Sequence, residues 1–301
     1  MRFGALLGKQ RPFWNFATEK SRLRSQGKRA MWLLSNAELT GLDLTNNEVG
    51  EDFDEAGDGL GRLVGIATTL NTLRLADNFL GKLDWRKQQF TRALSGSESL
   101  TELNVRNNGL EEKGVRMVCN ALQTCKSLRT LDLSFNRPFR EPALPSLLRM
   151  HPSLMDVGVI EEGKGKLDSR AKIIIGQALT ERRDPKMFAM QNDIFQVYTD
   201  TTSIDWPVTA EYGDVLMLAG IIQTNTTLTS FKFRSENLND DDQETLGRAM
   251  LKHRAGRIGY CSNFGLHEPK AASPEPNKTT GPKAGAVAAA SRAPAGKGKE
   301  D

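Results

Sequence analysis

Few residues in this 301-residue chain have the type and spacing that chemistry requires. The three histidines are His151, His253 and His267. The three cysteines are Cys119, Cys125 and Cys261. None of the histidines has a second potential metal ligand at a useful spacing, and the cysteines form no C-x-x-C pair. The phosphate-binding, zinc-protease and serine-hydrolase patterns G-x-x-x-x-G-K-[ST], H-E-x-x-H and G-x-S-x-G are absent from the sequence. The sequence therefore predicts no enzyme, no catalytic residue, no metal and no cofactor.

The acidic run Asp240–Asp242 is the nearest approach to a cation site. It lacks the glycine and the distal glutamate of an EF-hand loop. Asn239 precedes it, and this arrangement is typical of a solvated helix N-terminus. We expect a helix to begin there, without a bound metal.

One apolar frame, L-x-x-L-x-L-x-x-N-x-L, occurs four times between residues 39 and 138 and must supply the scaffold for any site. The copies begin at Leu39, Leu70, Leu100 and Leu128. Their asparagines are Asn47, Asn78, Asn108 and Asn136. In L-x-L, both apolar side chains point to one face of a short strand and the residue between them to the other. A carboxamide both donates and accepts hydrogen bonds, so the asparagines are predicted to form a structural ladder along the buried turns.

This frame resembles the leucine-rich repeat family, and the ending N-x-L-x-x-x-G at Asn108, Leu110 and Gly114 is similar to its ribonuclease-inhibitor-like subclass. The resemblance implies an α/β leucine-rich repeat solenoid, a horseshoe with an inner parallel sheet and outer helices. Parallel strands need a crossover element between them. Apolar residues at helical spacing over 53–67 and 115–122 predict that element independently.

Three regions are predicted along the chain. Residues 1–34 form a basic N-terminal segment, either a cap over the first repeat or an organelle presequence. Residues 35–266 form the solenoid, which is regular over 39–160 and degenerate over 161–266. Residues 267–301 are rich in Pro, Ala and Lys with little apolar bulk, and are predicted to be a disordered tail.

The degenerate part gives weaker strand signals. Phe188 and Met190 are expected in the apolar slots of a sixth strand, and residues 194–214 form an atypical insert. Ile258 and Tyr260 are expected to face inward from a terminal strand.

Charge and hydropathy exclude two classes of partner. The net charge is +4, of which residues 1–30 contribute +7 and residues 268–301 contribute +2, leaving 4 − 7 − 2 = −5 for the middle. A body of this sign has no electrostatic footprint for nucleic acid. The longest apolar run, residues 215–222, is far shorter than the roughly 20 residues that span a bilayer. With no disulfide framework, we expect a cytoplasmic monomer that binds neither nucleic acid nor membrane.

Residues between and just after the paired leucines of each copy should lie on the concave face, where curved repeat arrays hold their partners. The candidate partner-binding residues there are Asp43, Arg74, Asn104, Arg106, Asp132, Phe135, Lys232 and Arg234. The charges among them equally suit lateral ion pairs between neighbouring strands. Phe135 suits a binding hot spot, or packing against Pro138 and Phe139.

The function predicted is a non-enzymatic scaffold that binds a protein of unknown identity on its concave face. Two alternatives follow from resemblance. The repeats are similar to those of Ran GTPase-activating proteins, although the segment Phe79–Lys82 lacks the arginine that such proteins use. The short solenoid is also similar to tropomodulin, which implies binding at the actin pointed end.

Overall fold

The computed structural model describes one body of alternating strands and helices. The residues it describes are 13–15, 39–50, 56–83, 89–136, 142–160, 167–182, 189–191, 195–206, 211–232, 238–253 and 260–261. The chain divides into two units, Met1–Glu268 and Pro269–Asp301, and every described residue lies in the first. The predicted tail lies outside the described residues.

The larger sheet has eight strands whose order in space is their order in the sequence. They are β1 (Phe13–Asn15), β2 (Gly41–Asp43), β3 (Thr72–Arg74), β4 (Glu102–Asn104), β5 (Thr130–Asp132), β6 (Asp156–Gly158), β7 (Ala189–Gln191) and β8 (Gln196–Val197). All neighbours from β1 to β7 pair in parallel. One strand per repeat in this order is what the apolar frame predicts.

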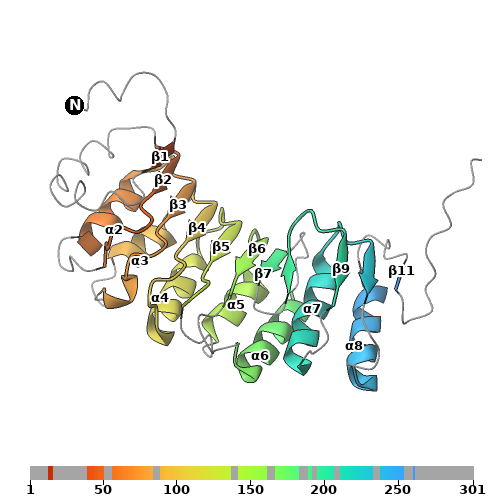
Figure 1. The fold of residues 1–301 in the computed structure, drawn as a ribbon. Helices are drawn as coiled ribbons and strands as arrows, with labels where there is room; N and C mark the ends of the chain where they lie inside the picture. Colours follow the sequence, from red (N-terminus) through yellow and green to blue (C-terminus); the bar gives the residue numbers. More distant parts are fainter. Residues whose placement is uncertain are drawn as a thin grey trace, which may run out of the picture. The chain divides into compact units, whose positions relative to one another are not determined.

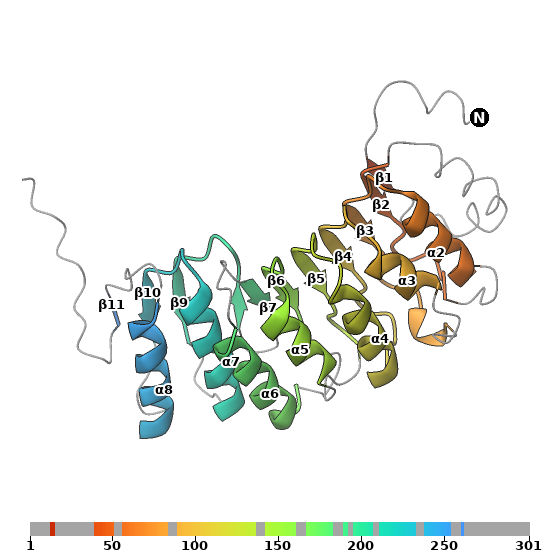
Figure 2. The ribbon, with the colours of Figure 1, turned by 180° about the vertical axis from the view of Figure 1, so that it is seen from behind.

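Helices supply the crossovers and lie along one face of the strands (Figures 1 and 2). They are α2 (Ala56–Ile66), α3 (Gln89–Ser95), α4 (Glu112–Leu122), α5 (Ala143–Met150), α6 (Ser169–Thr180), α7 (Tyr212–Thr224) and α8 (Asp240–Leu251), with the short 3-10 helix η2 (Leu80–Lys82) after β3. The prediction of an α/β leucine-rich repeat solenoid with outer helices is confirmed. Asn239 caps α8 as expected, since its side chain accepts a hydrogen bond from the Asp242 N–H at 2.8 Å.

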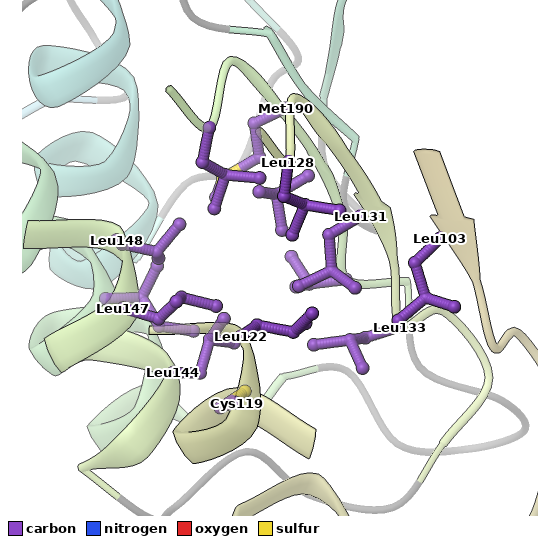
Figure 3. Packing of buried hydrophobic residues seen from close by; sticks show 14 of the residues in the cluster. Leu103, Cys119, Leu122, Leu128, Leu131, Leu133, Leu144, Leu147, Leu148 and Met190 are labelled. Atoms are coloured by element: carbon purple, nitrogen blue, oxygen red, sulfur yellow. The ribbon is translucent and has the colours of Figure 1, made fainter. Parts of the chain in front are cut away.

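The core is a stack of equivalent leucines. Leu42, Leu73, Leu103, Leu131 and Val157 stand side by side in the strand register and are fully buried. Figure 3 shows Leu131 and Leu133 of one repeat facing Leu144, Leu147 and Leu148 of α5 across the core. Burial of these side chains, at roughly 25 cal/mol per Å² of apolar surface, drives the stacking.

The four asparagines lie in the buried turns after β2, β3, β4 and β5. Asn108 is representative. Its Oδ1 accepts from the N–H groups of Asn78 and Leu80 at 3.0 and 3.2 Å, and its Nδ2 donates to the carbonyls of Leu75 and Arg106 at 2.8 and 3.0 Å. Three of these four groups belong to the preceding repeat. Each carboxamide thus joins two repeats and satisfies turn N–H and C=O groups that the strand ladder does not reach.

A second series of polar side chains joins the repeats at the opposite ends of the strands. Thr69, Ser99 and Ser127 each donate a hydroxyl hydrogen bond at 2.8 Å to the carbonyl of a leucine one repeat earlier. Cys125 and His151 lie in the same helix-to-strand turns. The Cys125 thiol donates to the Ser97 carbonyl at 3.4 Å.

His151 is a structural member of this second series. Its Nδ1 accepts from the Leu154 N–H at 3.0 Å, so its Nε2 donates to the Cys125 carbonyl at 3.0 Å. Burial lowers the pKa of His151, which keeps the ring neutral. The buried Arg182 guanidinium in turn donates to the His151 carbonyl at 2.9 Å.

The N-terminal segment contributes a strand that the sequence analysis did not predict. Trp14 of β1 pairs in register with Leu42 of β2. Residues 13–15 therefore extend the sheet by one strand. That residues 1–34 act as a cap stays a prediction.

The sheet is interrupted at the atypical insert. β8 turns back and pairs antiparallel with β7, with Met190 opposite Val197. A separate three-stranded parallel sheet then forms in the order β11, β10, β9, from β9 (Ser203–Asp205), β10 (Ser230–Lys232) and β11 (Tyr260–Cys261). The insert lacks the leucine frame and is packed through aromatic rings instead. The buried ring of Trp206 contacts Phe195 of the insert and Phe231 of β10.

Two registers differ from those expected. Met190 pairs with Val157, which places it in the first apolar slot of β7 instead of the second. Phe188 lies outside the described residues. In β11, Cys261 pairs with Phe231 and Tyr260 with Ser230, so the register of this strand also differs from the one expected.

The helix layer stays continuous where the sheet is interrupted. α6 and α7 approach closely, since a Cβ on Gly213 or Gly220 would lie 2.4 or 2.3 Å from a Cβ of α6. Lys172 of α6 is fully buried, and its Nζ lies 3.0 Å from Oδ1 of the buried Asp214 of α7. The Asp214 carboxylate also accepts from the Glu211 N–H at 3.0 Å. This buried ion pair fixes how the two helices meet.

We expect Asn108→Ala to lower the free energy of unfolding by about 3 kcal/mol or more, because the Asn78 and Leu80 N–H groups and the Leu75 carbonyl lose their partner at about 1–3 kcal/mol each. Urea denaturation followed by circular dichroism measures this. Asn120→Ala on the exposed side of α4 is the control and should change the free energy by less than about 0.5 kcal/mol. Equal effects of the two substitutions would contradict the ladder's role.

Lys172→Met should cost about 3–5 kcal/mol, because it leaves the Asp214 carboxylate buried without its cation. The double variant Lys172→Met/Asp214→Asn should recover at least half of that loss in the same denaturation experiment. Arg170→Met, at an exposed position of α6, serves as the control. A double variant no more stable than the single one would show that the ion pair is not the cause.

Candidate functional site

The candidate site is the face of the larger sheet that points away from the helices, here called the open face. It consists of the two residues that flank the buried apolar residue in each strand. The first row is Thr72, Glu102, Thr130, Asp156 and Ala189, and the second is Asp43, Arg74, Asn104, Asp132, Gly158 and Gln191. Because the strands are only three residues long, each offers little more than these two side chains to a partner.

Three of the predicted residues have a structural contact, and of these Asp43 is buried whereas Asn104 and Asp132 are half-buried. One side-chain oxygen of Asp43, Asn104 and Asp132 accepts a hydrogen bond at 2.9 Å from the N–H two residues later. These bonds close the bend after each strand. They use one oxygen of each side chain for the fold.

Arg74 occupies the equivalent position in β3 and interacts differently. Its Nε lies 2.9 Å from Oε1 of Glu102 on the next strand, with the Arg74 side chain 42% exposed. This hydrogen bond raises the pKa of Arg74 above its ordinary value, against the opposing effect of burial. A lateral ion pair does form on the open face, as the sequence allowed, and its acid is Glu102; the charge of Asp43 also raises the pKa of Arg74.

Arg106 and Phe135 lie together beyond the ends of β4 and β5. The exposed Arg106 guanidinium stacks 4.1 Å from the centre of the half-buried Phe135 ring. Phe135 has a φ of 59°, in the left-handed region. At the equivalent position the other repeats place Asn46, Asp77 and Asn107, with φ of 57°, 58° and 48°. A short polar side chain tolerates this conformation and a bulky one rarely adopts it, so Phe135 departs from the pattern of its repeat.

The remaining two predicted residues do not join this group. Lys232 is exposed on β10, in the smaller sheet, where it pairs in register with Asp205 of β9. Arg234 lies outside the described residues. The structure therefore brings together Asp43, Arg74, Asn104, Arg106, Asp132 and Phe135 on the larger sheet and leaves Lys232 on the smaller one.

The sequence analysis missed the first row of the open face, above all Glu102 and Asp156. Strand alternation places the residue before the buried leucine on the same face as the residue after it, and that signal was available. The Asp156 carboxylate accepts from Gln191 Nε2 at 3.1 Å. Burial, together with the negative charges of Asp132 and Glu102, raises the pKa of Asp156 to about 6. Asp156 is thus held in a site unfavourable to its negative charge.

Metal ligands and reactive thiols are the other groups that could do chemistry in the described part of the chain. No group of three or more His, Cys, Asp or Glu residues there could hold a metal ion. The Cys119 thiol is buried, which raises its pKa to about 12 and leaves it unreactive. No described helix is long and apolar enough to cross a membrane. Phe79 precedes the short helix η2, Leu80–Lys82, and the segment Phe79–Lys82 contains no arginine.

Comparison of the sequence with family models supports the repeat assignment over part of the chain. A family model described as Leucine Rich repeat matches residues 96–119 and 124–139, which contain β4 and β5. Among solved structures, the leucine-rich repeat-containing protein LegL7 from Legionella pneumophila is similar over 80% of this chain and 80% of that chain, with 15% sequence identity and a TM-score of 0.38. No curated protein matches the sequence. The recurring frame and the parallel strand-helix repeats are those of a leucine-rich repeat fold, and the family-model match over 96–119 and 124–139 supports it.

We expect Asp156→Asn to stabilise the protein by about 1–2 kcal/mol at pH 7.5. The raised pKa means that the folded state binds more protons than the unfolded state between about pH 4 and 6, so ionisation of Asp156 costs stability as pH rises through that range. The advantage of the variant should therefore disappear near pH 4. Urea denaturation across this pH range measures it, and Asp200→Asn, at an exposed turn, is the control.

Proposed function

We propose that this protein is a non-enzymatic scaffold that binds a protein partner on the open face of its larger sheet. The observation that carries the proposal is the Arg106–Phe135 pair. The Phe135 ring is half-buried and the Arg106 guanidinium is exposed, and both lie at the edge of a polar face. Aromatic residues and arginine dominate binding hot spots. Repeat arrays commonly present their strand face to partners.

The surroundings of this pair suit binding. The two ladders already satisfy the buried turns on either side of the strands, and the outward side chains of Arg74 and Glu102, although paired with each other, remain 42% and 32% exposed. Helices cover the other face of the same strands (Figure 2). The strand face is therefore the part of the sheet that a partner can reach.

The helical crossover in each described repeat also supports assignment to the ribonuclease-inhibitor-like subclass, which we retain as a proposal. Regulation of a Ran-like GTPase and binding at the actin pointed end gain no specific support from the described residues.

The test compares capture of partners by three forms of the full-length protein. Replacement of Arg74, Arg106 and Phe135 by alanine should remove the proteins that quantitative mass spectrometry finds specifically enriched on the wild-type chain. Hot-spot residues typically contribute about 2 kcal/mol or more each, so the loss should exceed tenfold.

The matched control replaces two exposed cations and one exposed apolar residue of the helix layer, Lys113, Arg170 and Met150, by alanine. It should capture the same proteins as the wild type. If the control loses them and the open-face variant retains them, the partner binds the helix layer and the proposal is wrong.

A further inference from the structure

We infer that the partner of the open face presents a lysine or arginine side chain to the carboxylates of Asp132 and Asp156, with an apolar residue beside it against Phe135. This inference rests on the proposed function and names the chemistry of the segment that binds.

The charges of the open face are unbalanced. Its described carboxylates are Asp43, Glu102, Asp132 and Asp156. Of its two described guanidinium groups, that of Arg74 bonds to Glu102 and that of Arg106 stacks on Phe135. Within the described part of the chain, no ion pair involves Asp132 or Asp156. A cation supplied by the partner would complete the pairing that the fold leaves open.

The two carboxylates lie on adjacent strands and are both partly exposed. Asp156 pairs in register with Thr130, and Asp132 with Gly158. A Cβ on Gly158 would lie 2.5 Å from Oδ1 of Asp132 and 2.8 Å from Oγ of Ser134, so no side chain fits between the two acids at that position. A long cationic side chain can therefore reach both acids from solvent.

The environment of Asp156 favours a cation over a neutral group. The fold has already removed much of the water around this carboxylate, and its acidic neighbours disfavour its charge. An approaching ammonium or guanidinium group therefore meets a lower desolvation cost than at a fully hydrated acid and relieves the repulsion between Asp132 and Asp156.

Phe135 fixes where the apolar part of the segment lies. It follows β5, the strand that carries Asp132, by three residues, and its ring is half-buried under Arg106. The arrangement selects a basic residue next to an apolar one. A purely acidic segment would meet four carboxylates and is rejected by charge.

The probe is a library of random dodecapeptides displayed on phage and selected against the full-length protein. The enriched peptides should contain a lysine or arginine next to an apolar residue. A synthetic copy of the most enriched peptide should bind the Asp132→Asn/Asp156→Asn variant at least tenfold more weakly than the wild type. Both substitutions keep the side-chain shape and the oxygen that accepts from Ser134 N–H or Gln191 Nε2.

The control variant Asp240→Asn/Asp241→Asn removes the same two charges from the exposed first turn of α8 and should bind as the wild type does. Titration of the Asp156 carboxyl by NMR gives a second readout. Its pKa should fall when the peptide binds, and an unchanged pKa would contradict direct contact.

The outcomes separate this inference from the proposed function. Selection without enrichment of basic peptides, or undiminished binding to the Asp132→Asn/Asp156→Asn variant, overturns the inference. If the same peptides still depend on Arg74, Arg106 and Phe135, the open face remains the binding surface. Binding that depends on neither set of residues overturns both proposals.

Discussion

The N–H and C=O groups of the buried turns need hydrogen-bond partners, and the rest of this structure depends on that constraint. Strands of three residues leave most of each repeat outside the sheet ladder, yet the stack removes those segments from water. Carboxamides such as those of Asn78 and Asn108 meet the need by bonding two repeats at once. Hydroxyls such as that of Ser127 do the same at the other strand end. The apolar stack and the polar ladders are therefore one solution, because leucines could not be buried beside unpaired amides.

The two faces of the sheet differ because the apolar stack constrains only one of them. The face under the helices is set by packing, so Leu73, Leu103 and Leu131 recur with almost no variation. The outward positions of the same strands have no packing partner and differ from repeat to repeat. Arg74, Asn104 and Asp132 occupy one row with three different chemistries. Variation where the fold makes no demand leaves room for recognition.

The regular part of the fold could be predicted from the sequence. Core packing requires leucines, and hydrogen bonding in the turns requires asparagines, at positions that recur in each repeat. The interruption could not be predicted, since β8 and β9 arise from an insert without that pattern. β1 was missed although a signal existed: Trp14 precedes Leu42 by 42 − 14 = 28 residues, the spacing between Leu103 and Leu131, but Glu19 stands where a ladder asparagine would be. The register of Met190 was missed for the same reason, because a short apolar run without the asparagine does not fix its own register.

The candidate site was only half predictable for a related reason. Sequence alternation places Asp132 and Asp156 on one face, but which acid takes the place beside Arg74 depends on the register of β3 and β4. Phe135 was visible as an aromatic, whereas its left-handed backbone was not. Three other repeats use asparagine or aspartate at that position, so the strained phenylalanine is held by the surrounding turn instead of by its own preference. A fold that places a ring under an exposed guanidinium at such a cost leaves that ring where a partner can contact it.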